Sequence, residues 1–274
     1  MTWQTGPMRW QTFLLWCVVL TLCVTLIAQN FTSWKLVEQA PAVDLGHGAR
    51  LIVKQVKGPV NVKLTLVFFD QDHCTMRVIS QQDRRTAQKA TEMLGGGIAI
   101  CNGGYFKNAA VGFLPSAMEI ADGVRASEFA DMAPTTGALV VTPAGPSLIT
   151  AQEFKRVAGI SQMLECGPIL VTDGVPLPRE SKELRAHRTF IATDGGKRWC
   201  IGVTEPVGLG ELAALLMTPG LMNECPVHSA LNLDGGPSTS LAWRGKDGTI
   251  SHAQQPGIVR NYVQVVPVKS ASQP

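Results

Sequence analysis

Short apolar runs, broken by glycines and charged turns, make up most of the hydrophobic pattern of this chain. Residues 62–68 alternate between apolar and polar positions, which predicts a half-buried strand. Residues 188–193 and 198–204 are two further runs joined by Asp194-Gly195-Gly196, and together they predict a β-hairpin. Other short strands are expected at residues 98–101, 138–141, 169–171, 230–233, 240–243 and 262–266.

Two segments have the composition of helices. Residues 81–94 predict a helix that ends at Gly95-Gly96-Gly97, and residues 211–217 predict a second, shorter one. Residues 30–58 are expected to form a polar lead-in segment. Because helices and strands are interspersed along the chain, the expected fold class is mixed α/β (α+β). A single domain would have a mixed β-sheet core flanked by short helices.

The first thirty residues differ from the rest of the chain. Residues 13–28 carry no charge, and Arg9 precedes them. A run of roughly 16–18 apolar residues lies between the length of a signal-peptide core and that of a membrane span. Residues 1–30 therefore predict a cleaved signal peptide or a retained membrane anchor. A buried core helix is the alternative, which the terminal position disfavours.

Export follows from either form of the N-terminal segment. Residues 31–274 would form the exported domain, in the periplasm, held at the inner membrane facing the periplasm, or secreted. Contact with the membrane would then be made through the N-terminal segment if it is not cleaved. The oligomeric state is left open.

The charge and cysteine content of the chain limit which binding partners and disulfide bonds can be expected. The 24 basic and 21 acidic residues give a net charge of +3, without a Lys/Arg stripe, which disfavours a nucleic-acid binder. Two of the seven cysteines lie in the apolar run, and the other five are an odd number, so at least one of them lacks a partner within the chain. Disulfides and free buried thiols both stay open for these five. They are Cys74, Cys101, Cys166, Cys200 and Cys225.

Two glycine-rich corners are the main candidates for chemistry. Asn102-Gly103-Gly104 and Asp234-Gly235-Gly236 each follow a short apolar strand and open with a polar side chain. Glycine pairs permit close approach of a ligand and leave backbone N–H groups free to face an anion. Ser238 adds a hydroxyl beside Asp234. An ordinary tight turn is the alternative for each corner taken alone.

Arg188, at the start of a predicted strand, is a candidate for binding phosphate oxygens, because a guanidinium matches their geometry. A solvated surface arginine is the alternative. The chain has no phosphate-binding loop, no nucleophile elbow and no HExxH zinc pattern, so neither a metal nor a cofactor is expected. Carboxylates and carbonyls at the glycine turns could host calcium, although nothing in the pattern indicates it.

Four segments of the chain combine short apolar strands with glycine corners. They are residues 98–106 (IAICNGGYF), 166–174 (CGPILVTDG), 188–197 (RTFIATDGGK) and 208–241, which ends in LNLDGGPSTSL. In this order they resemble the phosphodiester glycosidase family, over roughly residues 80–266 and most specifically in the last segment. Three positions depart from the family pattern: Pro237 replaces a common third glycine, Cys166 replaces an alanine, and Glu205-Pro206 replaces an Asp-Gly.

The resemblance implies a mixed α/β fold and an exported glycosidase that hydrolyses a sugar-1-phosphodiester, with an N-acetylglucosamine-type sugar in envelope polysaccharide. Asp234 would stabilise the positive sugar carbon or act as nucleophile or base, Arg188 would hold the phosphate, and Asn102 would orient the sugar. A second carboxylate is left open among Asp173, Asp194 and Glu205. The residues expected to bind substrate are Gly103, Gly104, Tyr105, Thr193, Asp194, Gly235, Gly236 and Ser238, and backbone N–H groups of Gly103, Gly104 and Gly236 would face the phosphate.

Two other functions remain compatible with the sequence. One is a non-catalytic domain that binds envelope polysaccharide, and the other is a different exported hydrolase on the same fold. Convergence of Asn102, Arg188 and Asp234 on one small pocket is the condition that the glycosidase interpretation must meet.

Overall fold

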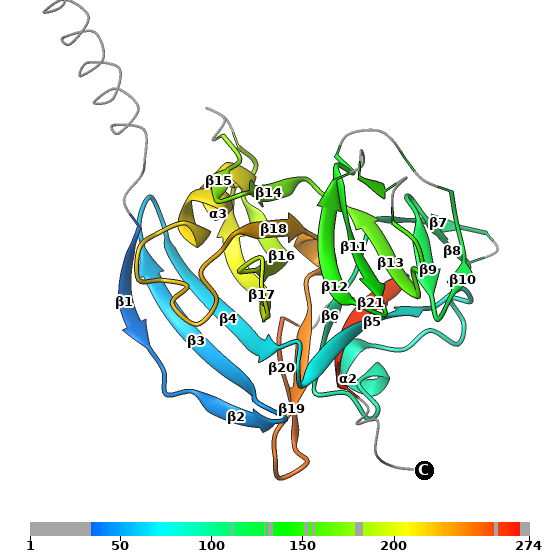
Figure 1. Ribbon diagram of the computed structural model, residues 1–274, viewed down its shortest axis with the longest axis horizontal. Coiled ribbons are helices and arrows are strands. Elements are labelled where there is room, and N and C mark those ends of the chain that lie inside the picture. The colour runs from blue at the N-terminus through cyan, green and yellow to red at the C-terminus, as the bar shows by residue number, and fades with distance from the viewer. Residues whose placement is uncertain are drawn as a thin grey trace, which may run out of the picture. The chain divides into compact units, whose positions relative to one another are not determined.

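The computed structural model describes residues 34–110, 112–128, 130, 134–150, 153–154, 157–178, 183–254 and 257–268. These described residues form one compact unit, drawn as a coloured ribbon in Figure 1. The predicted targeting segment, residues 1–30, lies outside the described residues, so its role stays a prediction. In the described ranges, no helix is long and apolar enough to cross a membrane.

The largest sheet has nine strands among the residues that the structure describes. Each of its neighbouring strand pairs is antiparallel. Its strands, in spatial order, are β1 (Lys35–Gln39), β3 (Ala49–Lys57), β4 (Asn61–Asp70), β17 (Arg198–Val207), β16 (Ala186–Thr193), β18 (Ser229–Asn232), β14 (Ile169–Thr172) and β15 (Val175–Pro176), with β2 (Val43–Gly46) paired to β3.

Smaller antiparallel sheets complete this unit. One has the order β10 (Val124–Arg125), β9 (Glu119–Ala121), β13 (Gln162–Cys166), β11 (Gly137–Thr142) and β12 (Gly145–Thr150). Another has the order β20 (Ile250–Ala253), β19 (Leu241–Arg244), β6 (Ala99–Asn102), β21 (Asn261–Pro267) and β5 (Cys74–Ser80). β7 (Phe106–Ala109) and β8 (Gly112–Pro115) form a separate hairpin. The helices are α2 (Ala90–Met93), α3 (Leu209–Leu216) and the 3₁₀ turn η2 (Gly236–Ser238).

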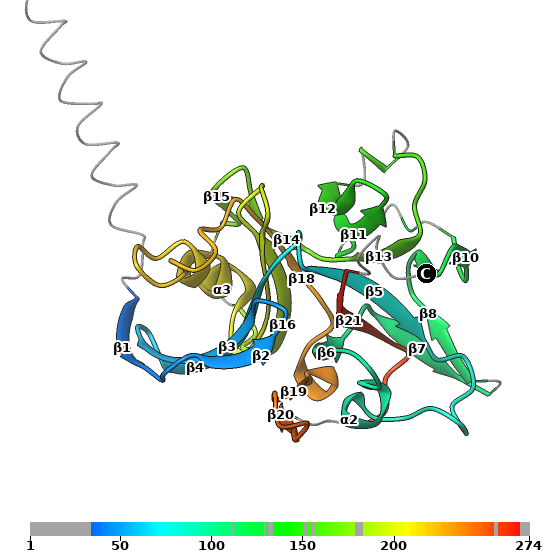
Figure 2. The same ribbon diagram turned by 60° about the horizontal axis from the view of Figure 1, so that its bottom comes forward.

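Among the described residues, the two largest of four hydrophobic clusters pack on opposite faces of the largest sheet. Along β16, Ile191 packs in one cluster and its neighbours Phe190 and Ala192 in the other, because successive strand side chains point to opposite faces. α3 covers the second face, where it buries Leu212 (Figure 2). Complete burial of such a side chain contributes about 1.5–3 kcal/mol, so alternating strands of this kind fix which face of the sheet each functional residue occupies.

The expected fold class is confirmed: one α+β domain has a sheet core and a few short helices, with strands in large excess. The β16–β17 hairpin, the helix near residues 211–217 and the short strands predicted elsewhere are present. The five described cysteines are all free and buried, so the buried-thiol alternative holds for them.

The polar lead-in predicted for residues 30–58 is wrong from residue 35 onward, because residues 35–57 contain β1, β2 and β3. These strands lie at one end of the largest sheet, and most residues of β1 and half of those of β2 are exposed. The exposed polar residues give the segment its polar composition. Composition therefore concealed strands that are held by pairing, β1 and β2 with β3, and β3 with β4.

The helix predicted over residues 81–94 is also largely wrong, since only Ala90–Met93 is helical. Gln81 is the physical reason: its side chain accepts a hydrogen bond from Gln88 N at 2.7 Å and donates to Gln88 O and Val259 O, each at 3.0 Å. These contacts hold the segment as a loop, which overrides its helix propensity. Arg84 and Arg85 lie in a turn of that loop, and both are exposed.

Candidate functional site

The two glycine-rich corners meet in space. Asn102 ends β6, and Asp234 lies two residues beyond the end of β18. The backbone N–H of Asp234 donates to Gly103 O at 3.0 Å, and the side-chain amide of Asn102 donates to Asp234 O at 2.6 Å. Segments 132 residues apart therefore form one hydrogen-bonded junction.

Asn102 is fully buried at this junction. Its Oδ1 accepts hydrogen bonds from Thr189 Oγ1 at 2.6 Å and from Ser240 N at 3.0 Å, while its Nδ2 serves Asp234 O. The amide thus joins β6 to β16 and to the segment before β19. Because both ends of the amide are engaged, Asn102 is suited to positioning the corners, and the predicted contact with a sugar does not fit its surroundings.

The glycines of the first corner lie in close packing, Gly103 against Asn261 and Gly104 against Leu164 and Glu165. A Cβ on Gly103 would lie 2.1 Å from Asn261 Oδ1, and one on Gly104 would lie 3.3 Å from Glu165 O. Gly103 N donates to Asn261 O at 2.9 Å, and Gly104 N donates to Asn261 Oδ1 at 2.8 Å. The expectation that these two N–H groups face a phosphate is therefore wrong, since both are used internally.

Asn261 is a functional neighbour that the sequence did not single out. Its Nδ2 donates to Glu119, whose carboxylate also accepts from the buried Arg260 at 3.0 Å. A carboxylate only accepts hydrogen bonds, so Glu119 turns the amide of Asn261 such that Oδ1 faces Gly104. No local motif marks this set, because its members come from β9 and β21 and meet only in the folded chain.

Arg188 lies beside the second corner. A Cβ on Gly235 would lie 2.8 Å from His187 O and 3.9 Å from Arg188 Cα, so the corner backbone packs on the start of β16. Arg188 Nε donates to Val207 O at 3.0 Å, and Nη2 donates to Leu184 O at 2.7 Å. A guanidinium has five N–H donors, so about three stay available for an anion. Burial lowers the pKa of Arg188, while Tyr105 and Glu183 oppose that shift.

Tyr105 lies within electrostatic range of both Arg188 and Asp234. Its hydroxyl donates to Gly167 O at 2.6 Å and accepts from Asn232 Nδ2 at 3.2 Å. Burial raises the pKa of Tyr105, and the Asp234 carboxylate adds to this, whereas Asn232 and Arg188 oppose it. The phenol is therefore held neutral between the cation and the carboxyl group.

The carboxyl group of Asp234 is half-buried, and burial raises its pKa. The Gly235 N–H, 2.8 Å from Oδ1, and the Ser238 hydroxyl both donate to the carboxylate and oppose the shift. Gly236 has φ of +57° with open space where a side chain would lie, so this turn leaves room beside the carboxyl group. The second corner therefore presents a half-buried carboxyl group with a raised pKa, two residues before a turn that has open space at Gly236.

Three buried polar atoms near this corner have no hydrogen-bond partner among the described residues: Asn232 Oδ1, Thr239 Oγ1 and Ser240 Oγ. Each such atom costs about 1–3 kcal/mol, and native structures contain few of them. They lie within six residues of Asp234 along the chain. Buried polar atoms of this kind suit an ordered internal water as the missing hydrogen-bond partner.

Thr193 and Asp194 are not brought to this place. Thr193 ends β16, five residues from Arg188, which is roughly 16 Å along a strand, and Asp194 follows it. Asp194 accepts hydrogen bonds from Gly196 N at 2.8 Å and from Arg198 Nε at 2.7 Å, so it builds the β16–β17 turn. Their assignment to the same pocket as Asp234 does not fit this placement.

The other carboxylates considered for a second role are also engaged elsewhere. Asp173 lies in the turn after β14, and Glu205 accepts a hydrogen bond from Lys63 N at 2.9 Å. Within the described part of the chain, no group of three or more His, Cys, Asp or Glu residues could hold a metal ion. The site thus combines one carboxyl group, one cation and several hydroxyl and amide groups. Such a set suits an anionic substrate next to a carbon that gains positive charge.

Comparisons with known proteins bear on the family and the fold of the chain. A sequence model described as phosphodiester glycosidase matches residues 95–266. The catalytic domain of zebrafish N-acetylglucosamine-1-phosphodiester alpha-N-acetylglucosaminidase, auto-inhibited by pro-peptide, is similar with a TM-score of 0.59 and 11% identity, covering 88% of this chain and 90% of that chain. A hypothetical protein from Synechocystis has a TM-score of 0.59 and 13% identity, covering 85% of this chain and 68% of that one. At these identities the structural likeness shows the shared fold. No curated protein sequence matches the chain.

The raised pKa of Asp234 predicts a pH-dependent gain in stability for Asp234→Asn. Because the folded pKa exceeds the unfolded one, the folded state holds more protons between the two values, and stability falls as pH rises through that window. Asparagine removes this loss, so the variant should have a higher thermal midpoint than the wild type at pH 7. The difference should vanish below the unfolded pKa of about 3.9.

Asp247→Asn is the matched control, because its change in thermal midpoint at pH 7 should have the opposite sign. Thr249 donates to Asp247 and lowers the pKa of that carboxyl, so removing its charge should destabilise the protein at pH 7. Equal shifts for the two variants would contradict the burial of Asp234. Differential scanning calorimetry between pH 3 and pH 8 measures both.

Proposed function

The chain belongs to the phosphodiester glycosidase family, and from this and from its site we propose that it hydrolyses the bond between a sugar's anomeric carbon and a phosphate oxygen. Family membership makes it a hydrolase of the carbohydrate-phosphodiester class. The proposed finer activity is release of an N-acetylglucosamine-type sugar from a phosphodiester in cell-envelope polysaccharide. The observation that carries the proposal is the meeting of Asp234, Arg188 and Tyr105 around one corner.

Arg188 is proposed to bind the phosphate. Two backbone carbonyls hold its guanidinium in place, and its remaining N–H donors supply the paired geometry that phosphate oxygens accept. Phosphate is a good leaving group, so neutralising its negative charge matters more for the reaction than protonating it with a general acid. The Tyr105 hydroxyl, which stays neutral, lies within electrostatic range of the Arg188 guanidinium.

Asp234 is proposed to act on the sugar side of the bond. As the bond from the anomeric carbon to the phosphate oxygen breaks, its electron pair leaves with the phosphate, and the sugar carbon gains positive charge. The Asp234 carboxylate stabilises that charge or takes a proton from the attacking water, whose oxygen forms the new bond to the carbon.

The site of action is proposed to be outside the cytoplasm. The support is the uncharged run at residues 13–28 with Arg9 before it, which has the pattern of an export segment. Fractionation of the native host should place the full chain in an envelope or secreted fraction, and a chain lacking residues 1–30 in the cytosol. Recovery of the full chain from the cytosol alone would refute export.

Asp234→Asn should lower turnover of a sugar-1-phosphodiester by at least about 10²-fold, the lower end of acid–base contributions. Uridine diphosphate N-acetylglucosamine, followed by release of N-acetylglucosamine, is a suitable soluble substrate. Asp247→Asn, which changes an exposed carboxylate of the β19–β20 loop, should keep normal turnover. Near-normal turnover by Asp234→Asn would remove Asp234 from the mechanism.

Arg188→Lys should impair hydrolysis of the phosphodiester more than hydrolysis of a neutral aryl glycoside, because lysine lacks the paired N–H geometry. A loss of about 10- to 100-fold in kcat/KM is expected with the phosphodiester, the cost of about one or two strong hydrogen bonds. Arg244→Lys is the matched control, since Arg244 also donates to two backbone carbonyls, those of Gly248 and Gly95, but from the end of β19. Equal losses on both substrates would refute the phosphate-binding role.

A further inference from the structure

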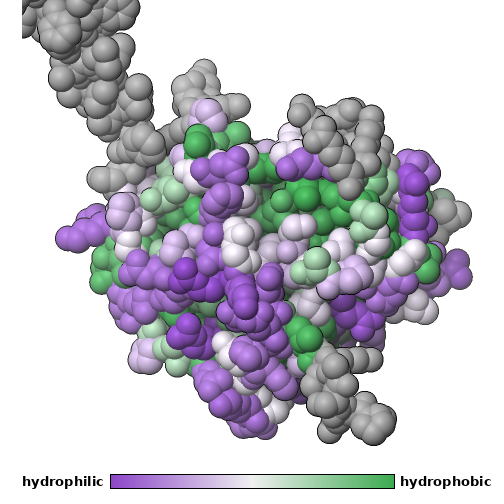
Figure 3. Space-filling model, in the orientation of Figure 1, coloured by the Kyte–Doolittle hydropathy of each residue, from purple (hydrophilic) through white to green (hydrophobic). Residues whose placement is uncertain are grey.

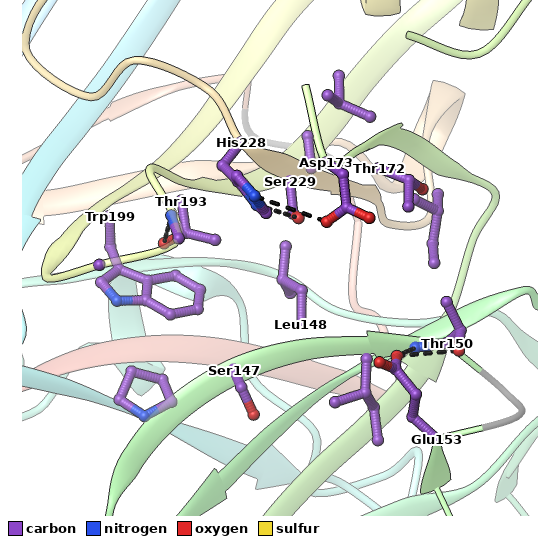
Figure 4. Close-up of a pocket in the computed structure, with 17 residues that line it drawn as sticks. Ser147, Leu148, Thr150, Glu153, Thr172, Asp173, Thr193, Trp199, His228 and Ser229 are labelled. Atoms are coloured by element: carbon purple, nitrogen blue, oxygen red, sulfur yellow. Dashed lines mark hydrogen bonds and ion pairs between the residues drawn. The ribbon is translucent and has the colours of Figure 1, made fainter. Parts of the chain in front are cut away.

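A cavity of about 460 Å³ lies away from the Asp234 corner (Figure 4). Ser147, Thr150 and Glu153 line one wall, on and just after β12, and Asp173, Thr193 and Ser229 line the other, at the ends of β14, β16 and β18. We call this cavity the β12 groove. Its volume falls in the range of ligand pockets, roughly 300–1,000 Å³.

We propose that the β12 groove binds a neutral part of the sugar chain whose phosphodiester is cleaved at the Asp234 corner. It would be a second carbohydrate subsite, and this inference rests on the proposed function. Three observations support it: the charge of the groove, the mixture of polar and apolar side chains, and the distance to Asp234.

The charge of the groove suits hydroxyl groups and disfavours phosphate. Glu153 and Asp173 are its carboxylates, and no lysine or arginine lines it among the described residues. Glu153 Oε2 accepts from Thr150 N at 2.7 Å, and Asp173 Oδ1 lies 3.5 Å from His228 Nε2. The second oxygen of each carboxylate stays available as a strong acceptor for sugar hydroxyls. A phosphate would be repelled here, whereas Arg188 attracts it at the other site.

Apolar side chains complete the surface that a sugar ring needs. Leu148 lies between the two polar walls in Figure 4 and is partly exposed. Ile169 is also partly exposed in the groove, whereas Trp199 and Val171 line it from buried positions. Figure 3 shows hydrophobic side chains gathered on this face around β11, β12 and β14, with polar ones over much of the remainder. Sugar rings present hydroxyls at their edges and C–H groups on their faces, and this lining matches both.

The strands set the distance between the groove and the corner. On β18, Ser229 lines the groove and Asp234 follows five residues later, which is roughly 16 Å of extended chain. On β16, Thr193 pairs with Ser229, and Arg188 lies five residues earlier, at the corner. Two neighbouring antiparallel strands therefore give the same spacing along the chain, which is the length of a short oligosaccharide and more than a single sugar. Because five residues is an odd number, the side chains of Thr193 and Arg188 point to opposite faces of the sheet, so a bound sugar chain would pass from the groove around the end of these strands to the corner.

The test compares Ser147→Trp with Ser251→Trp. Both serines are half-buried on edge strands, β12 and β20, but only Ser147 lines the groove. The wild type and Ser251→Trp should bind the neutral tetramer of N-acetylglucosamine in calorimetry, and Ser147→Trp should bind it at least about tenfold more weakly, a change of 1.4 kcal/mol. Lack of binding by the wild type, or equal binding by Ser147→Trp, would overturn the proposal.

A second variant guards against misfolding of β12. Asp173 has φ of +50°, and asparagine tolerates this conformation, so Asp173→Asn keeps the turn while removing the charge. It should weaken tetramer binding severalfold, and unchanged binding would count against the carboxylate's role. Inorganic phosphate should not compete for the groove, and competition would refute its preference for neutral ligands.

Turnover separates this inference from the proposed function. Ser147→Trp should hydrolyse uridine diphosphate N-acetylglucosamine at the wild-type rate, because this short substrate does not reach the groove. It should lose kcat/KM only on a phosphodiester carrying a longer sugar chain. Tetramer binding without any phosphodiester hydrolysis would refute the proposed function while leaving a glycan site in the groove, whereas hydrolysis with no length dependence would refute the subsite alone.

Discussion

The buried amide of Asn102 is the contact on which the arrangement of the site depends. Its Oδ1 accepts from Thr189 and Ser240, and its Nδ2 donates to the backbone of Asp234, so one side chain connects three segments. A buried amide left without these partners costs about 1–3 kcal/mol for each unsatisfied group. The side-chain amide of Asn102 therefore has all of these partners only when the two corners lie together. Folding of the core and assembly of the site are coupled for this reason.

The strands and the two glycine-rich corners could be predicted from the sequence because each has a local sequence signature. The β16–β17 hairpin has alternating residues and a glycine turn, and the two corners combine a polar residue with a glycine pair. Asp234 and Arg188, which were predicted independently, do lie at one corner. The family resemblance added the order of these segments, and the matched range of residues 95–266 falls inside the predicted span.

What the sequence did not reveal depends on contacts between distant segments. Asn261, Glu119 and Arg260 hold the first corner through buried polar contacts between β9 and β21, and no spacing rule connects them. The same limit explains the donors wrongly assigned to Gly103 and Gly104, since a glycine pair looks alike whether its N–H groups face solvent or Asn261. Composition also misjudged residues 81–94, where hydrogen bonds of Gln81 to segments outside its own turn override helix propensity.

The hydrogen bonds of the first corner have a chemical consequence as well. In an Asn-Gly pair, the glycine nitrogen can attack the preceding side-chain amide and form a succinimide, which is how such pairs deamidate. In the folded chain, Gly103 N donates to Asn261 O, and the amide of Asn102 is held by three segments, so the two reacting groups are kept from each other. Folding therefore protects the residue that joins the corners. Time spent unfolded exposes it to an irreversible change that would put a negative charge into the core.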